Sequence, residues 1–245
     1  MMRLPALGGF LVALIACFAF SQEAPATGPA YRGPITRVEG IFVAPVPNVP
    51  FSAVVTIESR QLLSDGSTEA KSTRHQIARD TAGRIRNELR ELMPGGFTGT
   101  PTLISTHIYD PETRLSTFLN PATRIARQML LRSPMQIPPP FPVAAKNAAV
   151  KDEDLGTQVL ENVTVHGLRR TRTIPANLSG TGTPVEVTDE YWYSEDMRLN
   201  MLIVHEDPRS GKQTVTVTQM DRSEPAAELF QIPSEYKVVD ETPNR

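Results

Sequence analysis

The sequence predicts a mainly β protein, built as a single curved antiparallel sheet: a half-barrel or incomplete barrel with little helix. Two observations predict this class. Apolar and polar residues alternate with a period of two in most segments after residue 50, which is typical of strands with one buried face. Short turn signals separate these segments, as in a meander of hairpins. About ten strands are expected, and a sheet that wide curls or closes because its strands twist.

The chain begins with features of an export signal. Arg3 supplies a positive charge, and the 17 residues from Leu4 to Phe20 carry no charged side chain. Small Ala19 and Ser21 then occupy the positions that a signal peptidase reads. The run is shorter than the roughly 20 residues of a spanning helix. We therefore predict a signal peptide over residues 1–21, a periplasmic or extracellular location, and no membrane span in the mature chain.

The only cysteine, Cys17, leaves two interpretations open. Leu14-Ile15-Ala16-Cys17 resembles the bacterial lipobox, in which the cysteine is lipidated and becomes the new N-terminus. The alternative is a cysteine inside the apolar core of an ordinary signal, removed with it. With that signal removed the mature chain has no thiol, so it forms no disulfide and no Zn–Cys site.

Residues 22–50 are predicted to be a Pro/Ala-rich leader, partly a disordered spacer, with a possible edge strand at 41–43. Residues 51–245 follow as a single β domain. Its first strand alternates Phe51, Ala53, Val55 and Ile57 against polar residues. After an Asp-Gly turn, the polar segment 68–80 lacks a strong apolar face. We expect it to be solvated on both sides or to lie near an edge.

Segment 84–93 fits two structures. Ile85, Leu89 and Met93 lie on one face of either a helix or a strand. Composition favours a helix and the hairpin context favours a strand, and we predict a strand. Strands are then expected over 102–109, 114–119 and 124–131.

Three connections share one form: residues 110–113, 120–123 and 207–210 each begin with Asp or Asn followed by Pro. The acidic or amide side chain accepts a backbone hydrogen bond, and Pro presets φ for a type I turn. These turns predict neighbouring strands of a meander.

Residues 133–154 are predicted to leave the sheet as a Pro-rich excursion, because its five prolines cannot pair in a central strand. This excursion lies over the sheet, where it is able to cover the concave side, or beside it as an exposed extended segment. The second half then continues with strands over 157–165, 167–174, 185–193, 199–204 and 214–218. The strand 199–204 is apolar on both faces and is expected to be central.

A helical turn is expected at 224–229. We expect the tail Leu229–Pro233 to pack its apolar residues back onto the sheet.

The chemistry of the chain argues against most enzyme classes. The 25 basic and 27 acidic residues alternate in sign without a basic stripe, so no nucleic-acid partner is predicted. No two of the four histidines have metal-ligand spacing, and H-E-x-x-H and G-x-S-x-G are absent from the sequence. We predict no catalytic residue, no metal ligand and no cofactor.

The best candidates for ligand binding are aromatic. Tyr191 and Tyr193 share one strand face and Trp192 takes the other, while Met201 and Ile203 lie on one face of the following strand. These side chains form either the wall of a cavity or the packed core of the sheet.

The C-terminal third resembles a group of exported bacterial proteins of unknown function and, more distantly, the LolA-like carriers of outer-membrane lipoproteins. The resemblance rests on a WYS strand, an apolar strand, an Asp-Pro turn and an LF-x-x-P-x-x-Y ending: Glu190–Ser194, Leu199–Ile203, Asp207-Pro208, Leu229–Pro233 and Tyr236. It implies an incomplete antiparallel barrel around an apolar cavity for acyl chains.

These observations give three hypotheses. The first is a non-enzymatic periplasmic or envelope protein that binds an apolar ligand, a lipid or lipoprotein acyl chain, in a concave sheet. The second is an interaction module that binds an envelope protein through an edge strand or the Pro-rich segment. The third is a hydrolase, which would require a Ser or Asp hydrogen-bonded to a His in a cleft.

Overall fold

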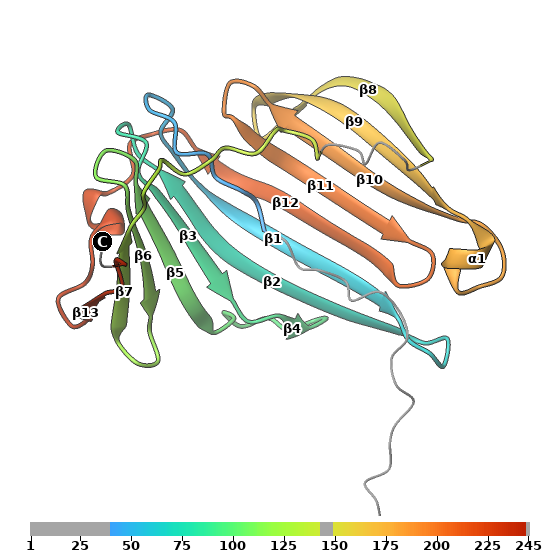
Figure 1. The fold of residues 1–245 in the computed structure, drawn as a ribbon, viewed down its shortest axis with the longest axis horizontal. Coiled ribbons are helices and arrows are strands. Elements are labelled where there is room, and N and C mark those ends of the chain that lie inside the picture. Colours follow the sequence, from blue (N-terminus) through green and yellow to red (C-terminus); the bar gives the residue numbers. More distant parts are fainter. Residues whose placement is uncertain (1–39, 143–148, 244–245) are drawn as a thin grey trace, which may run out of the picture. The chain divides into compact units, whose positions relative to one another are not determined.

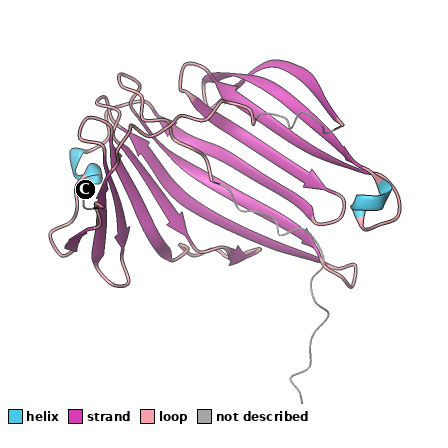
Figure 2. Cartoon of the chain, viewed as in Figure 1, coloured by secondary structure: helices cyan, strands magenta, loops and turns pink. Residues whose placement is uncertain are grey.

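The computed structural model describes residues 40–142 and 149–243. Within these residues the chain forms one curved, open sheet of 13 strands with little helix, which confirms the predicted fold class (Figures 1 and 2). The predicted signal peptide with Cys17, and the leader up to residue 39, lie outside the described residues.

The strands follow one another along the chain with only two short helical elements. The helical elements are α1 (Ala176–Ser179) and the 3₁₀ turn η1 (Ala227–Phe230). The strands are β1 (Phe51–Leu62), β2 (Thr68–Arg79), β3 (Ile85–Arg90), β4 (Met93–Pro94), β5 (Leu103–Asp110), β6 (Leu115–Asn120), β7 (Ile125–Leu130), β8 (Val150–Leu160), β9 (Val163–Ile174), β10 (Val185–Ser194), β11 (Leu199–Asp207), β12 (Gly211–Asp221) and β13 (Lys237–Asp240).

Strand β1 joins two wings of the sheet. It pairs with β2 on one side and with β12 on the other, in the order β13-β7-β6-β5-β3-β2-β1-β12-β11-β10-β9-β8. The N-terminal wing thus comprises β2–β7 and β13, and the C-terminal wing comprises β8–β12. The pairing of β13 with β7 is parallel and departs from the antiparallel pattern. The segment after β12 packs on the N-terminal wing and then reaches the outer edge of β7. There β13 runs in the same direction as β7.

The two faces of the sheet differ in what they bury. We call the face that carries Ala53, Val55 and Ile57 the inner face; these side chains are 0–4% exposed. The opposite, outer face carries a second cluster that contains Phe230 and Leu229. Its sheet residues are small or aliphatic: Ala78, Ile108, Leu119 and Ala126. The prediction that the tail packs onto the sheet is therefore confirmed.

The prediction for segment 68–80 was wrong. Strand β2 is interior, between β1 and β3, and its inner-face residues Thr73, His75 and Arg79 are buried. Their polarity hid the apolar alternation on which the prediction depended. Backbone and side-chain partners make the burial of Arg79 possible, as described below.

Three boundaries also differ from the predictions. Ile41 and Val43, placed in the leader, belong to the core and form no strand. Strand β8 begins at Val150, so residues 150–154 are not part of the excursion. The β8–β9 turn lies at Glu161-Asn162, whose φ values of 50° and 59° match the mirror-image turns that suit twisted hairpins. The turn contains no glycine, and the sequence reading therefore missed it.

Other local predictions are confirmed. Segment 84–93 contains the strands β3 and β4 and no helix. In the predicted Asp/Asn-Pro turns, Asp110 Oδ1 accepts the N–H of Glu112 at 2.9 Å and Asn120 Oδ1 accepts that of Thr123 at 3.0 Å. Strand β11 is interior, between β10 and β12, as its apolar character predicted.

Candidate functional site

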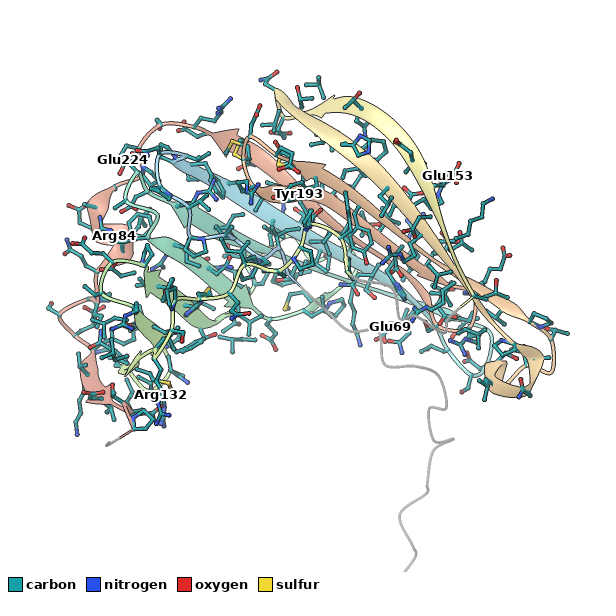
Figure 3. The ribbon with its side chains drawn as sticks, turned by 45° about the horizontal axis from the view of Figure 1, so that its top comes forward. Glu69, Arg84, Arg132, Glu153, Tyr193 and Glu224 are labelled. Atoms are coloured by element: carbon teal, nitrogen blue, oxygen red, sulfur yellow. The ribbon has the colours of Figure 1, made fainter. Side chains whose placement is uncertain are left out.

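A Pro-rich strap, residues 131–142, crosses the inner face from the N-terminal wing to the C-terminal wing (Figures 1 and 3). The N–H of Met135 donates to Tyr109 Oη of β5 at 3.0 Å. At the other end, Asn200 Nδ2 of β11 donates to the carbonyl of Pro140 at 3.1 Å, and Arg170 of β9 donates to that of Pro142. Since its prolines have no N–H, the strap is held mainly through its carbonyls.

Phe141 of the strap packs against two of the predicted site residues. Its ring centroid lies 6.1 Å from that of Tyr191 and 6.2 Å from that of Tyr193, with interplanar angles of 62° and 68°. These are edge-to-face contacts. Tyr193 is 8% exposed, and burial raises its pKa. We call Phe141, Tyr191 and Tyr193 the aromatic cluster.

The structure divides the five predicted site residues. Tyr191 and Ile203 are paired across β10 and β11, and Tyr193 joins Tyr191 beneath the strap. Met201 is fully buried in the core.

Trp192 projects from the face of β10 opposite to Tyr191. It pairs with Gly167 of β9, and a Cβ placed on that glycine would come within 2.6 Å of the indole ring. Trp192 therefore packs directly over the backbone at Gly167, as a partly buried side chain at the margin of the core.

The N-terminal wing exposes apolar side chains on the same inner face, which the sequence reading did not single out. Leu89, Phe118 and Met129 are 51%, 51% and 38% exposed. The strand register places these residues on the inner face. Phe118 pairs with His107, and Met129 pairs with Ser116. We call these three residues the open patch. The alternation of β6 could have indicated Phe118, but Ser116 and Asn120 on the same face are polar, so no apolar face was recognisable.

A serine–histidine pair lies beside the open patch. His107 Nε2 is 2.9 Å from Ser116 Oγ, and the imidazole stacks on Phe118 at 4.4 Å. Burial lowers the pKa of His107 to about 4, so the ring is neutral at neutral pH. Ser116 is only 7% exposed, and in the described part of the chain no carboxylate bonds to the other ring nitrogen. The pair thus lacks the orienting acid of a triad.

The C-terminal wing carries a second polar group on the inner face. His205 Nδ1 lies 2.6 Å from Asp189 Oδ1, and this hydrogen bond raises the pKa of His205. Arg172 stands 4.0 Å from the same carboxylate. Arg170, on the neighbouring strand, makes two hydrogen bonds to Asp152. The basic residues of β9 are thus matched by acidic residues on the adjacent strands.

The described residues contain neither a metal-binding cluster nor a membrane-spanning helix. No group of three or more His, Cys, Asp or Glu side chains in them is placed to hold a metal ion. Within the same residues, no helix has the length and apolar character needed to traverse a bilayer.

Comparison with known proteins gives fold similarities only. No protein-family model and no curated protein sequence matches the chain. Among solved structures, an uncharacterized conserved protein from Thermus thermophilus is similar at a TM-score of 0.38 and 14% identity, over 78% of this chain and 90% of that one.

MucB is similar at a TM-score of 0.40 and 12% identity, over 78% of this chain; the match spans 60% of MucB. A LolA superfamily protein from Nitrosomonas europaea is similar at a TM-score of 0.28 and 12% identity, over 76% of this chain and 91% of that one.

Proposed function

We propose that the protein is a non-enzymatic envelope protein that binds an apolar chain, such as the acyl chain of a lipid or lipoprotein, on the inner face of its sheet. The observation that carries the proposal is the open patch. Leu89, Phe118 and Met129 are apolar, largely exposed and on the core-bearing face of the sheet. Exposed apolar side chains on one face of a curved sheet are suited to an apolar ligand.

The neighbouring residues define the chemistry of the ligand. Stacking on His107 holds the Phe118 ring, and the buried imidazole is neutral. The hydroxyl of Ser116 is already bonded to that imidazole. Arg127 pairs with Phe118 from β7, and its guanidinium is bonded to Glu241. The three side chains of the patch itself are apolar. Each methylene of an acyl chain that it buries contributes about 0.8 kcal/mol.

The strap covers one part of the proposed site and leaves the other part exposed. On the C-terminal wing, Phe141 covers the predicted ligand residues Tyr191 and Tyr193. On the N-terminal wing, the open patch remains exposed. We propose that an acyl chain binds first at the open patch, and that the aromatic cluster lines the site where the strap moves aside. Ile203 pairs with Tyr191 from β11, while Met201 is buried in the core.

The location is part of the proposal. Residues 1–21 read as a signal peptide, which supports an exported protein, and Cys17 supports a lipid anchor as one form of it.

The experiment is titration of the purified exported chain with pyrene-labelled dodecanoate, followed by fluorescence. We expect saturable binding that weakens by about tenfold or more in the double variant Leu89→Ser/Phe118→Ser, since each apolar side chain contributes on the order of 1–2 kcal/mol when covered by ligand. The matched control is Val159→Ser, which removes an apolar side chain 65% exposed on β8. Equal affinity in the double variant and the wild type would overturn the proposal.

An envelope protein that pairs with the sheet edge is the second candidate. Edge strand β8 carries charges in its first half, whereas its second half, Gly156–Leu160, is uncharged and exposes Val159. A free edge of this kind accepts an added strand. Loss of binding to an envelope protein in Val159→Lys, with binding of the fatty-acid probe unchanged in the titration, would favour this candidate.

A further inference from the structure

The outer face contains a pocket that the proposed function does not use. It has a volume of about 240 Å³ and opens over β1 and β2, away from the open patch and the strap. Its lining combines three strands, the β12 bulge and η1: Ser52, Ala53, Val54, Gln76, Ile77, Ala78, Arg86, Gln219 and Leu229. The volume corresponds to about eight water molecules, or a molecule of comparable size.

A bulge in the sheet creates the depth of this pocket. Between Ser52 and Val54 the register of β1 against β12 shifts, and Gln219 adopts a positive φ of 54°. A bulge leaves a residue out of the ladder and bends its strand. The floor contains two small side chains, Ser52 and Ala78, which pair across β1 and β2. Arg86 pairs with Ala78 from β3.

The charge of the pocket comes from one guanidinium. Arg86 Nη2 lies 3.3 Å from Glu88 Oε1, and Arg90 Nε lies 2.9 Å from Glu88 Oε2. One carboxylate thus faces two guanidinium groups, so this trio carries one more positive than negative charge. Arg86 is the member of this trio that lines it, and its side chain is 16% exposed.

Arg86 also has unused hydrogen-bonding capacity. A guanidinium carries five N–H donors. In the described structure one bond goes from Nη1 to the carbonyl of Leu229 at 3.2 Å and one from Nη2 to Glu88, while the buried Nε has no partner. Each Nη carries a second hydrogen that these bonds do not use, and Gln76 and Gln219 are exposed residues of the lining.

We infer that this pocket binds a small organic carboxylate. The carboxylate pairs with Arg86, since guanidinium and carboxylate groups form strong charge-assisted hydrogen bonds. Val54, Ala78 and Leu229 contact its aliphatic portion. This apolar lining favours an organic anion over inorganic phosphate.

The test is saturation-transfer NMR of the full chain with butanoate, butanamide and inorganic phosphate. We expect saturable butanoate binding and at least about tenfold weaker binding of the two other probes, because butanamide has no charge and phosphate has no aliphatic part. Arg86→Gln should weaken butanoate binding by about tenfold or more. Arg74→Gln is the matched control, since this exposed arginine lies on β2 outside the pocket.

A second variant keeps the test valid if Arg86→Gln fails to fold. Ser52→Leu fills the floor of the pocket while keeping every charge, and it should abolish butanoate binding. The inference is overturned by the absence of saturable butanoate binding, by equal binding of butanamide, by equal or tighter binding of phosphate, or by unchanged affinity in a folded variant.

Discussion

At the scale of single residues, Arg79 connects segments that are distant in sequence. Its side chain is fully buried, and it donates to the carbonyls of Val49, Ala44 and Met197 at 2.8–2.9 Å. The guanidinium also lies 4.9 Å from the ring of Phe51. Burial lowers its pKa to about 10, which leaves it protonated at neutral pH. Arg79 thus ties the segment before β1 and the β10–β11 turn to β2.

We predict that Arg79→Met lowers the free energy of unfolding by about 3 kcal/mol or more, because buried carbonyls lose their donors. Urea titration followed by circular dichroism measures this change. Arg74→Met, at an exposed position of the same strand, should stay within about 0.5 kcal/mol of the wild type. Equal losses in both variants would contradict the structural role of Arg79.

The alternation of apolar residues in the sequence identified only some of the buried residues on the inner face. Phe51, Ala53, Val55 and Ile57 were predicted correctly because each is apolar. The facing residues of β2 were missed, since a buried arginine or histidine reads as solvated until its partners are known.

At the scale of elements, the strap differs in kind from the strands it crosses. It is held by a small number of hydrogen bonds and by the ring of Phe141 against Tyr191 and Tyr193. A segment with few bonds opens more readily than a paired strand. Its composition predicted that it would leave the sheet. Its position on the inner face depended on Tyr109 and Asn200, which belong to distant strands.

We predict that Phe141→Ala loosens the strap. Each edge-to-face pair contributes about 0.5–1.5 kcal/mol, so loss of both contacts should raise amide exchange at Met135 roughly tenfold. Hydrogen exchange read by mass spectrometry measures this rate. Ile137→Ala is the control, because this strap side chain is 44% exposed and has no ring contact in the described structure. Unchanged exchange in Phe141→Ala would show that the aromatic cluster does not anchor the strap.

At the scale of the whole sheet, two pairings join parts of the chain that are far apart in sequence. Strand β1 pairs with β12, and β7 pairs with β13. All other neighbours in the main path follow from local hairpins or short connections. Each wing without the other would leave a strand edge and part of the inner core exposed.

We predict that fragments cut between residues 142 and 149 do not fold separately. The piece 40–142 would lose the partner of β1, and the piece 149–245 would lose the partner of β12. Gel filtration and circular dichroism should find each fragment unfolded or aggregated, and a mixture of both should recover strand structure. Cooperative unfolding of one isolated fragment would show that its wing is an independent domain.

The sequence by itself determined the strands, the Asp/Asn-Pro turns and the antiparallel class, because these depend on neighbours within a few residues. It also indicated the aromatic residues of β10, though not what covers them. Only the tertiary structure decided that the strap lies on Tyr191 and Tyr193, and that the open patch is exposed on the other wing. Strand order and curvature bring those residues to one face, and a period-two pattern contains no information about either.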